Sequence, residues 1–140
     1  MSDSAQSPKV VLIVEDEQSI RDALIELFDV DENVVHSAEL LPDALEKLRT
    51  QRFDLVVTDL RLGGKRDGGL QVLALTGMLS PDATVVVLTA YPDDSNRQAS
   101  FRLGALHFLE KPVDLVIIAN HAAAAGVRTA FEAAENRQAK

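Results

Sequence analysis

The sequence predicts an α/β fold in which five parallel strands form one sheet and helices cover both of its faces. Short aliphatic runs alternate five times with segments whose composition or apolar spacing is helical, which is the pattern of strand–helix units. Most of these runs are apolar at consecutive positions, as in strands buried on both faces. Together the two observations predict a parallel sheet enclosed by helices.

The first half of the chain provides three of the strands and two helices. Residues 10–14 (VVLIV) form an apolar run that ends in three acids, and the stretch FDLVVTDLR contains a second buried run at residues 55–57. A short strand is expected between them at Val34 and Val35. Two helices flank this strand, the second with Pro42 in its first turn. Their apolar positions are Ile20, Leu24, Leu27 and Phe28, and then Ala44, Leu45 and Leu48.

The second half provides two more strands and three helices. Residues 85–88 and 105–109 are the strands, and a glycine-rich loop, LGGKRDGG, precedes the third helix. That helix is expected to bury Leu70, Leu73, Ala74 and Met78. The fourth, residues 93–103, has few large apolar residues and should be the most weakly held. The last is expected to run over residues 113–135, about 34 Å at ~1.5 Å per residue.

The length of 140 residues fits a single domain. We expect a disordered tail at residues 1–8, the domain at residues 9–125, and an extension of the last helix at residues 126–140. No apolar run approaches the ~20 residues of a membrane span, and the first residues do not resemble a signal peptide. The sequence therefore predicts a cytoplasmic protein with no membrane contact.

The charge balance limits the possible partners. A net charge of -8 and a pI near 4.8 argue against direct nucleic-acid binding, which depends on clustered Lys and Arg. The chain has no cysteine, so disulfides and thiolate metal sites are excluded. Such an acidic chain suits a metal cation or a basic partner.

Four of the five predicted strands end in a charged or hydroxyl residue. Because the ends of parallel strands share one edge of the sheet, these side chains should lie around one cleft. Clustered carboxylates repel one another, and a divalent cation such as Mg²⁺ would compensate. An Asp nucleophile, a Lys and a Thr beside it suit phosphoryl transfer. The residues are Glu15 and Asp16, Asp59, Thr89 and Lys111.

Each of these residues also has an ordinary structural interpretation. Glu15 and Asp16 could simply begin a helix, Thr89 could be a strand residue and Lys111 a solvated charge. Only their common register with Asp59 favours a site. The three histidines show no metal-ligand spacing, and the glycine-rich loop lacks the Gly-Lys-Ser/Thr ending of a nucleotide-binding loop.

These motifs resemble the receiver domain of the bacterial two-component response regulators, and in particular the single-domain chemotaxis regulator. The resemblance covers residues 9–125. It rests on an acidic pair after the first strand, Asp59 after the third, Thr89-Ala90 after the fourth and Lys111-Pro112 after the fifth. It implies a flavodoxin-like fold with strand order 2-1-3-4-5.

The resemblance also implies a role for each site residue. Asp59 would accept a phosphoryl group from a sensor histidine kinase or a phosphotransfer protein. Mg²⁺ would be the cofactor, and Lys111 would pair with the phosphoryl oxygens. Thr89 and the aromatic Phe108 would move on activation, although Phe108 fits a core residue equally well. The implied magnesium ligands are Asp16, Asp59, Glu15 through water and the backbone carbonyl of Arg61, and the Lys111-Pro112 peptide bond would be cis.

The chain departs from the family pattern around the expected acceptor. Gly63 stands where the family usually has proline, and Asp67-Gly68 falls one residue late. Two large residues, Arg61 and Tyr91, lie two positions beyond Asp59 and Thr89. Both would be next to the path of a hydrolytic water, so we expect a slowly hydrolysing phosphoaspartate.

The last predicted helix begins with five consecutive apolar residues, Leu115 to Ala119. They point all round the helix and cannot all face the sheet. One interpretation is dimerisation or target docking on the surface formed by the fourth helix, the fifth strand and the fifth helix. The other is that the alanine-rich end of the helix frays in solvent.

Two alternative functions stay open at this point. A Mg²⁺-dependent phosphohydrolase with an Asp nucleophile would want a second acid two residues later, where this chain has Arg61. A receiver-like domain that is never phosphorylated and serves only as an interaction domain is the other alternative.

Overall fold

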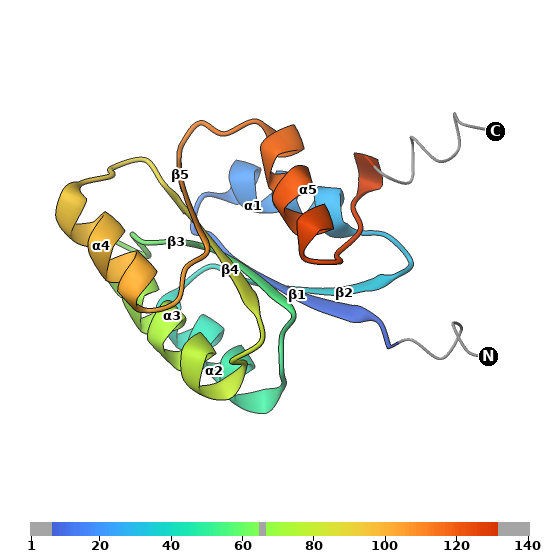
Figure 1. Cartoon of the computed structure of the whole chain (residues 1–140), viewed down its shortest axis with the longest axis horizontal. Helices are drawn as coiled ribbons and strands as arrows, with labels where there is room; N and C mark the ends of the chain where they lie inside the picture. The colour runs from blue at the N-terminus through green and yellow to red at the C-terminus, as the bar shows by residue number, and fades with distance from the viewer. Residues whose placement is uncertain (1–6, 65–66, 132–140) are drawn as a thin grey trace.

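The computed structural model describes residues 7–64 and 67–131, which form a parallel five-stranded sheet between two layers of helices (Figure 1). The strand order is β2-β1-β3-β4-β5, so the predicted topology is confirmed. The elements in chain order are β1 (Lys9–Val14), α1 (Gln18–Phe28), β2 (Asn33–Ala38), α2 (Leu41–Thr50), β3 (Leu55–Asp59), α3 (Gly68–Leu79), β4 (Thr84–Thr89), α4 (Asp94–Arg102), β5 (His107–Glu110) and α5 (Leu115–Ala124).

The apolar runs are buried on both faces of the sheet, as predicted. Along β1, Leu12 and Val14 belong to the core under α2 and α3, whereas Val11 and Ile13 belong to the core under α1 and α5. This alternation follows from the two-residue period of a strand. Because both faces of the strand are apolar, polar side chains can gather only at the ends of the strands.

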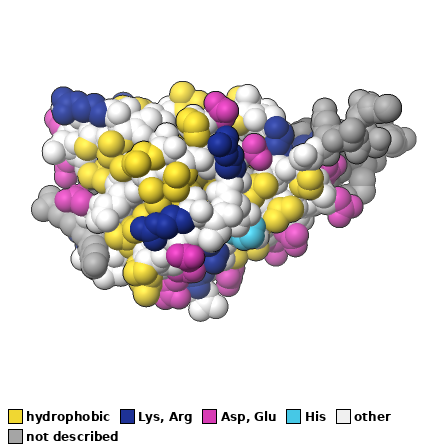
Figure 2. All heavy atoms as spheres, turned by 90° about the horizontal axis from the view of Figure 1, so that it is seen from below, with side chains coloured by type: hydrophobic (Ala, Val, Ile, Leu, Met, Phe, Trp, Pro, Cys, Tyr) yellow, Lys and Arg dark blue, Asp and Glu magenta, His cyan; other side chains and the backbone are white. Residues whose placement is uncertain are grey.

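Helix α3 does not present the face that its sequence suggested. Leu73 is buried as predicted, but Ala74 is exposed and Met78 is 74% exposed. Val72 and Thr76 are buried instead. The helix is apolar nearly all round, so spacing alone does not select the buried side. Figure 2, viewed from below, shows apolar side chains gathered on this side of the molecule.

The prediction of one long last helix is wrong. Helix α5 ends at Ala124, and Gly126 follows with a φ of 81°, a left-handed conformation that glycine adopts without steric cost. Beyond it, Val127 is buried in the core, and the Asn33 amide donates a hydrogen bond of 2.9 Å to the Arg128 carbonyl. The chain therefore turns back towards the start of β2. The rest of the expected extension, residues 132–140, and most of the expected tail lie outside the described residues.

Helix α4 is weakly held, as predicted, since Ser100 is its one buried residue. Among the described residues, no helix is both long enough and apolar enough to cross a membrane.

Candidate functional site

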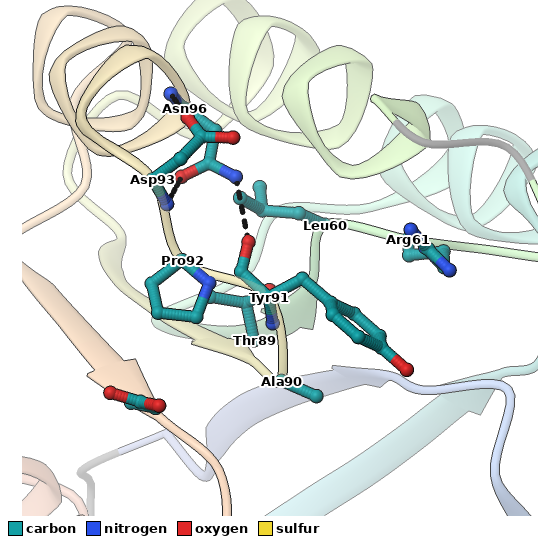
Figure 3. A pocket seen from close by; sticks show the side chains of 9 residues that line it. Leu60, Arg61, Thr89, Ala90, Tyr91, Pro92, Asp93 and Asn96 are labelled. Atoms are coloured by element: carbon teal, nitrogen blue, oxygen red, sulfur yellow. Dashed lines mark hydrogen bonds between the residues drawn. The ribbon is translucent and has the colours of Figure 1, made fainter.

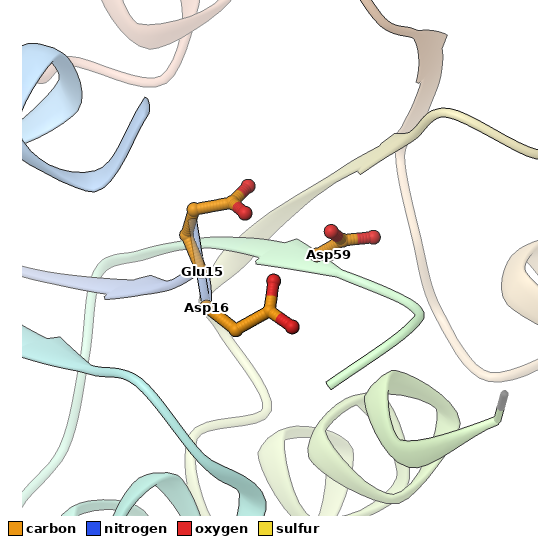
Figure 4. Close-up of side chains that lie close together, drawn as sticks. All are labelled: Glu15, Asp16 and Asp59. Atoms are coloured by element: carbon orange, nitrogen blue, oxygen red, sulfur yellow. The ribbon is translucent and has the colours of Figure 1, made fainter. Parts of the chain in front are cut away.

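Three carboxylates from two neighbouring strands converge at one edge of the sheet (Figure 4). Glu15 and Asp16 directly follow β1, and Asp59 is the last residue of β3, which pairs with β1 in parallel. Each of the three offers an oxygen within 4.8 Å of the others. Glu15 is fully buried and Asp59 is 6% exposed. The predicted acidic cluster is therefore formed.

Lys111 joins two of these carboxylates. Its ammonium lies 2.7 Å from Glu15 Oε1 and 2.8 Å from Asp59 Oδ2. The Lys111 N–H also donates to the Thr89 carbonyl at 2.8 Å, which aligns the end of β5 with that of β4. The Lys111-Pro112 peptide bond is cis, as expected.

Burial and hydrogen bonding have opposite effects on the pKa values in this cluster. Burial raises the pKa of Glu15, and the hydrogen bond from Lys111 offsets this only in part. Burial alone would lower the pKa of Lys111, but the hydrogen bonds to Asp59 and Glu15 together raise it. Lys111 is therefore charged at neutral pH and is shared between two acids.

The cluster is suited to a metal ion. When ionised, its three carboxylates outnumber the one ammonium, and the low dielectric of a buried site makes that imbalance unfavourable. Oxygen-only ligands of this kind favour a hard divalent cation over a transition metal. The described residues at this edge could thus hold a divalent ion beside Asp59.

Glycines shape the loop that follows Asp59. The N–H of Gly63 donates to Asp16 Oδ2 at 3.1 Å, and Gly63 has a φ of 58°. A Cβ on Gly69 would lie 2.2 Å from the Asp59 carbonyl oxygen, so α3 can approach the strand end only with glycine there. The sequence pointed to a glycine-rich loop, but it did not identify Gly69 as a site residue. Residues 65–66 of this loop lie outside the described part of the chain.

The predicted switch residue Thr89 is 2% exposed at the end of β4, beside the strand that carries Asp59. Its hydroxyl accepts a hydrogen bond of 3.1 Å from the Tyr91 N–H. The Arg61 guanidinium lies 4.4 Å from the centre of the Tyr91 ring, so the two large residues noted in the sequence stack on one another. Together with Ala90 they line a pocket of about 530 Å³ (Figure 3).

Phe108 is not part of the acidic cluster. It is half-buried on the α4 side of β5, with its ring centre 6.3 Å from that of Phe101. Two of the histidines also make a contact that the sequence did not predict. His107 of β5 and His121 of α5 stack with their ring centres 3.5 Å apart, and burial and His121 lower the pKa of His107.

Known proteins are similar to this chain in sequence. The response regulator receiver domain family matches residues 11–123. The response regulator protein PilR of Pseudomonas aeruginosa is 36% identical over 110 residues, which cover 78% of this chain but only 24% of PilR. Sporulation initiation phosphotransferase F of Bacillus subtilis is 31% identical over 105 residues, 75% of this chain and 83% of that protein. This chain thus spans about a quarter of PilR and most of the phosphotransferase.

A solved structure shows the same likeness. A Burkholderia pseudomallei response regulator, crystallised with a phosphorylated aspartic acid, a calcium ion and citrate, superposes with a TM-score of 0.71 at 28% identity. The match covers 79% of this chain and 64% of that one. The chain therefore belongs to the response regulator receiver domain family, and this domain is a phosphoacceptor signalling switch rather than a classical enzyme.

Proposed function

We propose that Asp59 is the phosphoacceptor and that a sensor histidine kinase or a phosphotransfer protein is the donor. The observation that carries this proposal is the position of Lys111, which holds Asp59 and Glu15 in one buried cluster with Asp16. The Burkholderia protein, with its phosphorylated aspartic acid and bound calcium, supports the assignment. The domain that performs this function comprises residues 9–125 of a cytoplasmic protein.

The proposed reaction needs only groups that already lie at this edge of the sheet. An Asp59 carboxylate oxygen attacks phosphorus, and an O–P bond forms as the N–P bond of the donor phosphohistidine breaks. The departing imidazole nitrogen keeps the bonding electrons and takes up a proton. Lys111 then exchanges its contact with Asp59 for one with a phosphoryl oxygen, so its charge stays paired throughout.

Mg²⁺ is the proposed cofactor. Asp16 and Asp59 would bind it directly, Glu15 through water, and Arg61 through its backbone carbonyl. When bound, the ion would neutralise charge that develops on the phosphoryl oxygens. Without it, the carboxylates would repel the incoming phosphoryl group.

Mass spectrometry of the intact protein tests this proposal. After incubation with acetyl phosphate, we expect one added phosphoryl group that requires both Mg²⁺ and Asp59. Asp59→Asn should give no adduct, and Asp54→Asn, which changes a carboxylate at the other end of β3, should be labelled normally. Labelling of the Asp59→Asn variant would refute the assignment. If a folded wild type accepts no phosphoryl group from acetyl phosphate or from a histidine-phosphorylated donor, it is a receiver that acts by interaction alone.

The stacked Arg61 and Tyr91 are expected to lengthen the life of the phosphoaspartate. They line the pocket beside Thr89, where a hydrolytic water would approach. Replacing both with alanine should therefore speed dephosphorylation severalfold, measured as decay of the phosphorylated mass after the donor is removed. An unchanged decay rate would show that this pair does not limit access of water.

We propose that phosphorylation acts through Thr89 and Phe108 on the surface formed by α4, β5 and α5, which then dimerises or binds a target. Exposed apolar residues flank β5: Phe101 on α4, and Ile117 on α5, one turn from the His121 that stacks on β5. Ile118, at the next position, is buried in the core and is not part of this surface.

Changing Ile117 tests that surface. In sedimentation of the phosphorylated protein, we expect a dimer for the wild type and a monomer for Ile117→Glu, with thermal stability nearly unchanged. Met78→Glu is the control, because Met78 is an exposed apolar residue on α3. Equal dimerisation of all three proteins would exclude this interface.

A further inference from the structure

Asn96, in the first turn of α4, ties that helix to the loop that follows β4 (Figure 3). Its N–H donates to Asp93 Oδ1 at 2.7 Å, and its side-chain oxygen accepts from the Asp93 N–H at 3.0 Å. These two bonds form the capping box of α4. A third bond does not belong to the cap: Asn96 Nδ2 donates to the Tyr91 carbonyl at 3.1 Å.

Tyr91 connects this third bond to the phosphoacceptor site. Its N–H donates to the Thr89 hydroxyl, and its ring lies on the Arg61 guanidinium. The ring is not held in place by burial, because Tyr91 is 63% exposed. Two side chains hydrogen-bond its backbone: the Thr89 hydroxyl accepts from the Tyr91 N–H, and the Asn96 amide donates to the Tyr91 carbonyl.

We propose that Asn96 is a positioning residue that holds the receiver in its resting state. Its amide fixes the Tyr91 backbone, and the Tyr91 N–H in turn donates to the Thr89 hydroxyl, which ties the position of that hydroxyl to the loop. The hydroxyl proton stays able to donate, but if Thr89 moves towards a phosphoryl group on Asp59, either this chain of hydrogen bonds breaks or the loop moves with Thr89. The inference rests on the proposed switch role of Thr89.

Because α4 is weakly packed, the hydrogen bond from Asn96 to the Tyr91 carbonyl should affect the position of the helix. Ser100 is the helix's one buried residue, so few apolar contacts resist its displacement. The Ser100 hydroxyl donates to the Asn96 carbonyl at 2.7 Å, which links that residue to the Asn96 turn. A change at Thr89 can thus pass through Tyr91 and Asn96 to α4, which forms part of the proposed interaction surface.

Two substitutions separate this role from helix capping. Asn96→Asp keeps the backbone N–H and a side-chain acceptor for the Asp93 N–H, but loses the donor to the Tyr91 carbonyl. Asp93→Ala removes the acceptor of the cap and leaves the Asn96 donor in place. If the proposal is right, the first variant releases the loop and the second mainly weakens the helix.

Tyr91 itself provides the measurement, because the chain has one tyrosine and no tryptophan. Intrinsic fluorescence therefore reports on this ring alone. In the resting protein, acrylamide should quench Tyr91 more strongly in Asn96→Asp than in the wild type or in Asp93→Ala. Equal quenching in all three, with folding checked by circular dichroism, would overturn the proposal.

Beryllofluoride, a mimic of the phosphoryl group, tests the coupling to the acceptor. Asn96→Asp should bind it about two- to tenfold more tightly with Mg²⁺ present, because one hydrogen bond no longer opposes activation. An equal gain in Asp93→Ala, or no gain in Asn96→Asp, would count against the inference. If the wild type does not bind beryllofluoride, the proposed function fails, and the quenching comparison still decides whether Asn96 holds the loop.

Discussion

Replacing Gly69 with alanine is expected to destabilise the fold by about 3 kcal/mol or more and to abolish phosphorylation. The added methyl group would lie 2.2 Å from the Asp59 carbonyl oxygen and 2.6 Å from the Leu60 Cα. Both are backbone atoms that cannot rotate away, so α3 or the end of β3 has to move. Either shift displaces the Asp59 carboxylate from Lys111.

Gly77 provides a control within the same helix. A Cβ there would meet only the Leu103 carbonyl oxygen, at 3.9 Å, which is an ordinary contact. Gly77→Ala should therefore stabilise the protein by about 0.5–1 kcal/mol, because alanine is the better helix former. Urea unfolding and acetyl phosphate labelling of both variants would check this. Gly69→Ala with wild-type stability and labelling would show that α3 does not need the close approach.

Replacing Glu15 with glutamine is expected to stabilise the metal-free protein at neutral pH by about 1 kcal/mol while weakening its response to Mg²⁺. Burial raises the pKa of Glu15 despite the contact with Lys111. Burying the ionised carboxylate therefore destabilises the fold by more than the ion pair with Lys111 stabilises it. Removing it does not strand the ammonium of Lys111, which keeps Asp59 at 2.8 Å.

The stability difference between the wild type and Glu15→Gln should depend on pH. Below the ordinary Glu pKa of 4.5, Glu15 is protonated in both the folded and the unfolded chain, so its ionisation does not affect the free energy of unfolding. As the pH rises from there through the raised folded pKa, the wild type should lose stability relative to Glu15→Gln. Above that pKa the difference should stay constant.

Thermal unfolding at several pH values, with EDTA or with Mg²⁺, measures both effects. Glu110→Gln is the matched control. Glu110 lies exposed at the same edge of the sheet, so this substitution removes a carboxylate charge without removing a buried one. A Glu15→Gln variant that is less stable than the wild type in EDTA would mean that the pairing with Lys111 outweighs burial.

Much of the fold could be predicted from the sequence because its strands carry a strong signal. Runs such as residues 10–14 and 85–88 are short, rich in β-branched residues and apolar at every position, which is typical of strands covered on both faces. Parallel strands end at one edge, so the residues after those runs had to meet. The acidic cluster with Lys111 follows from that geometry and not from any local contact.

The errors occurred where local pattern and tertiary packing disagree. In α3, apolar residues lie on all sides of the helix, and packing against the rest of the protein buries the side that carries Val72 and Thr76. After α5, the alanine-rich composition suggested a continuing helix, but Gly126 and the burial of Val127 turn the chain back. In both segments the side chains that compete for the core decide the outcome.

By itself, the sequence determined the sheet, its strand order through the family resemblance, and which charged residues share its edge. Only the tertiary structure decided how the loops around that edge meet: Gly69 against the Asp59 carbonyl, Arg61 on Tyr91, and Asn96 on the Tyr91 backbone. The physical reason is that these contacts depend on backbone conformation outside the strands and helices. Apolar periodicity is a property of each segment by itself, whereas these contacts depend on the conformations that the loops after β3 and β4 adopt, and one of them, Arg61 on Tyr91, joins the two loops.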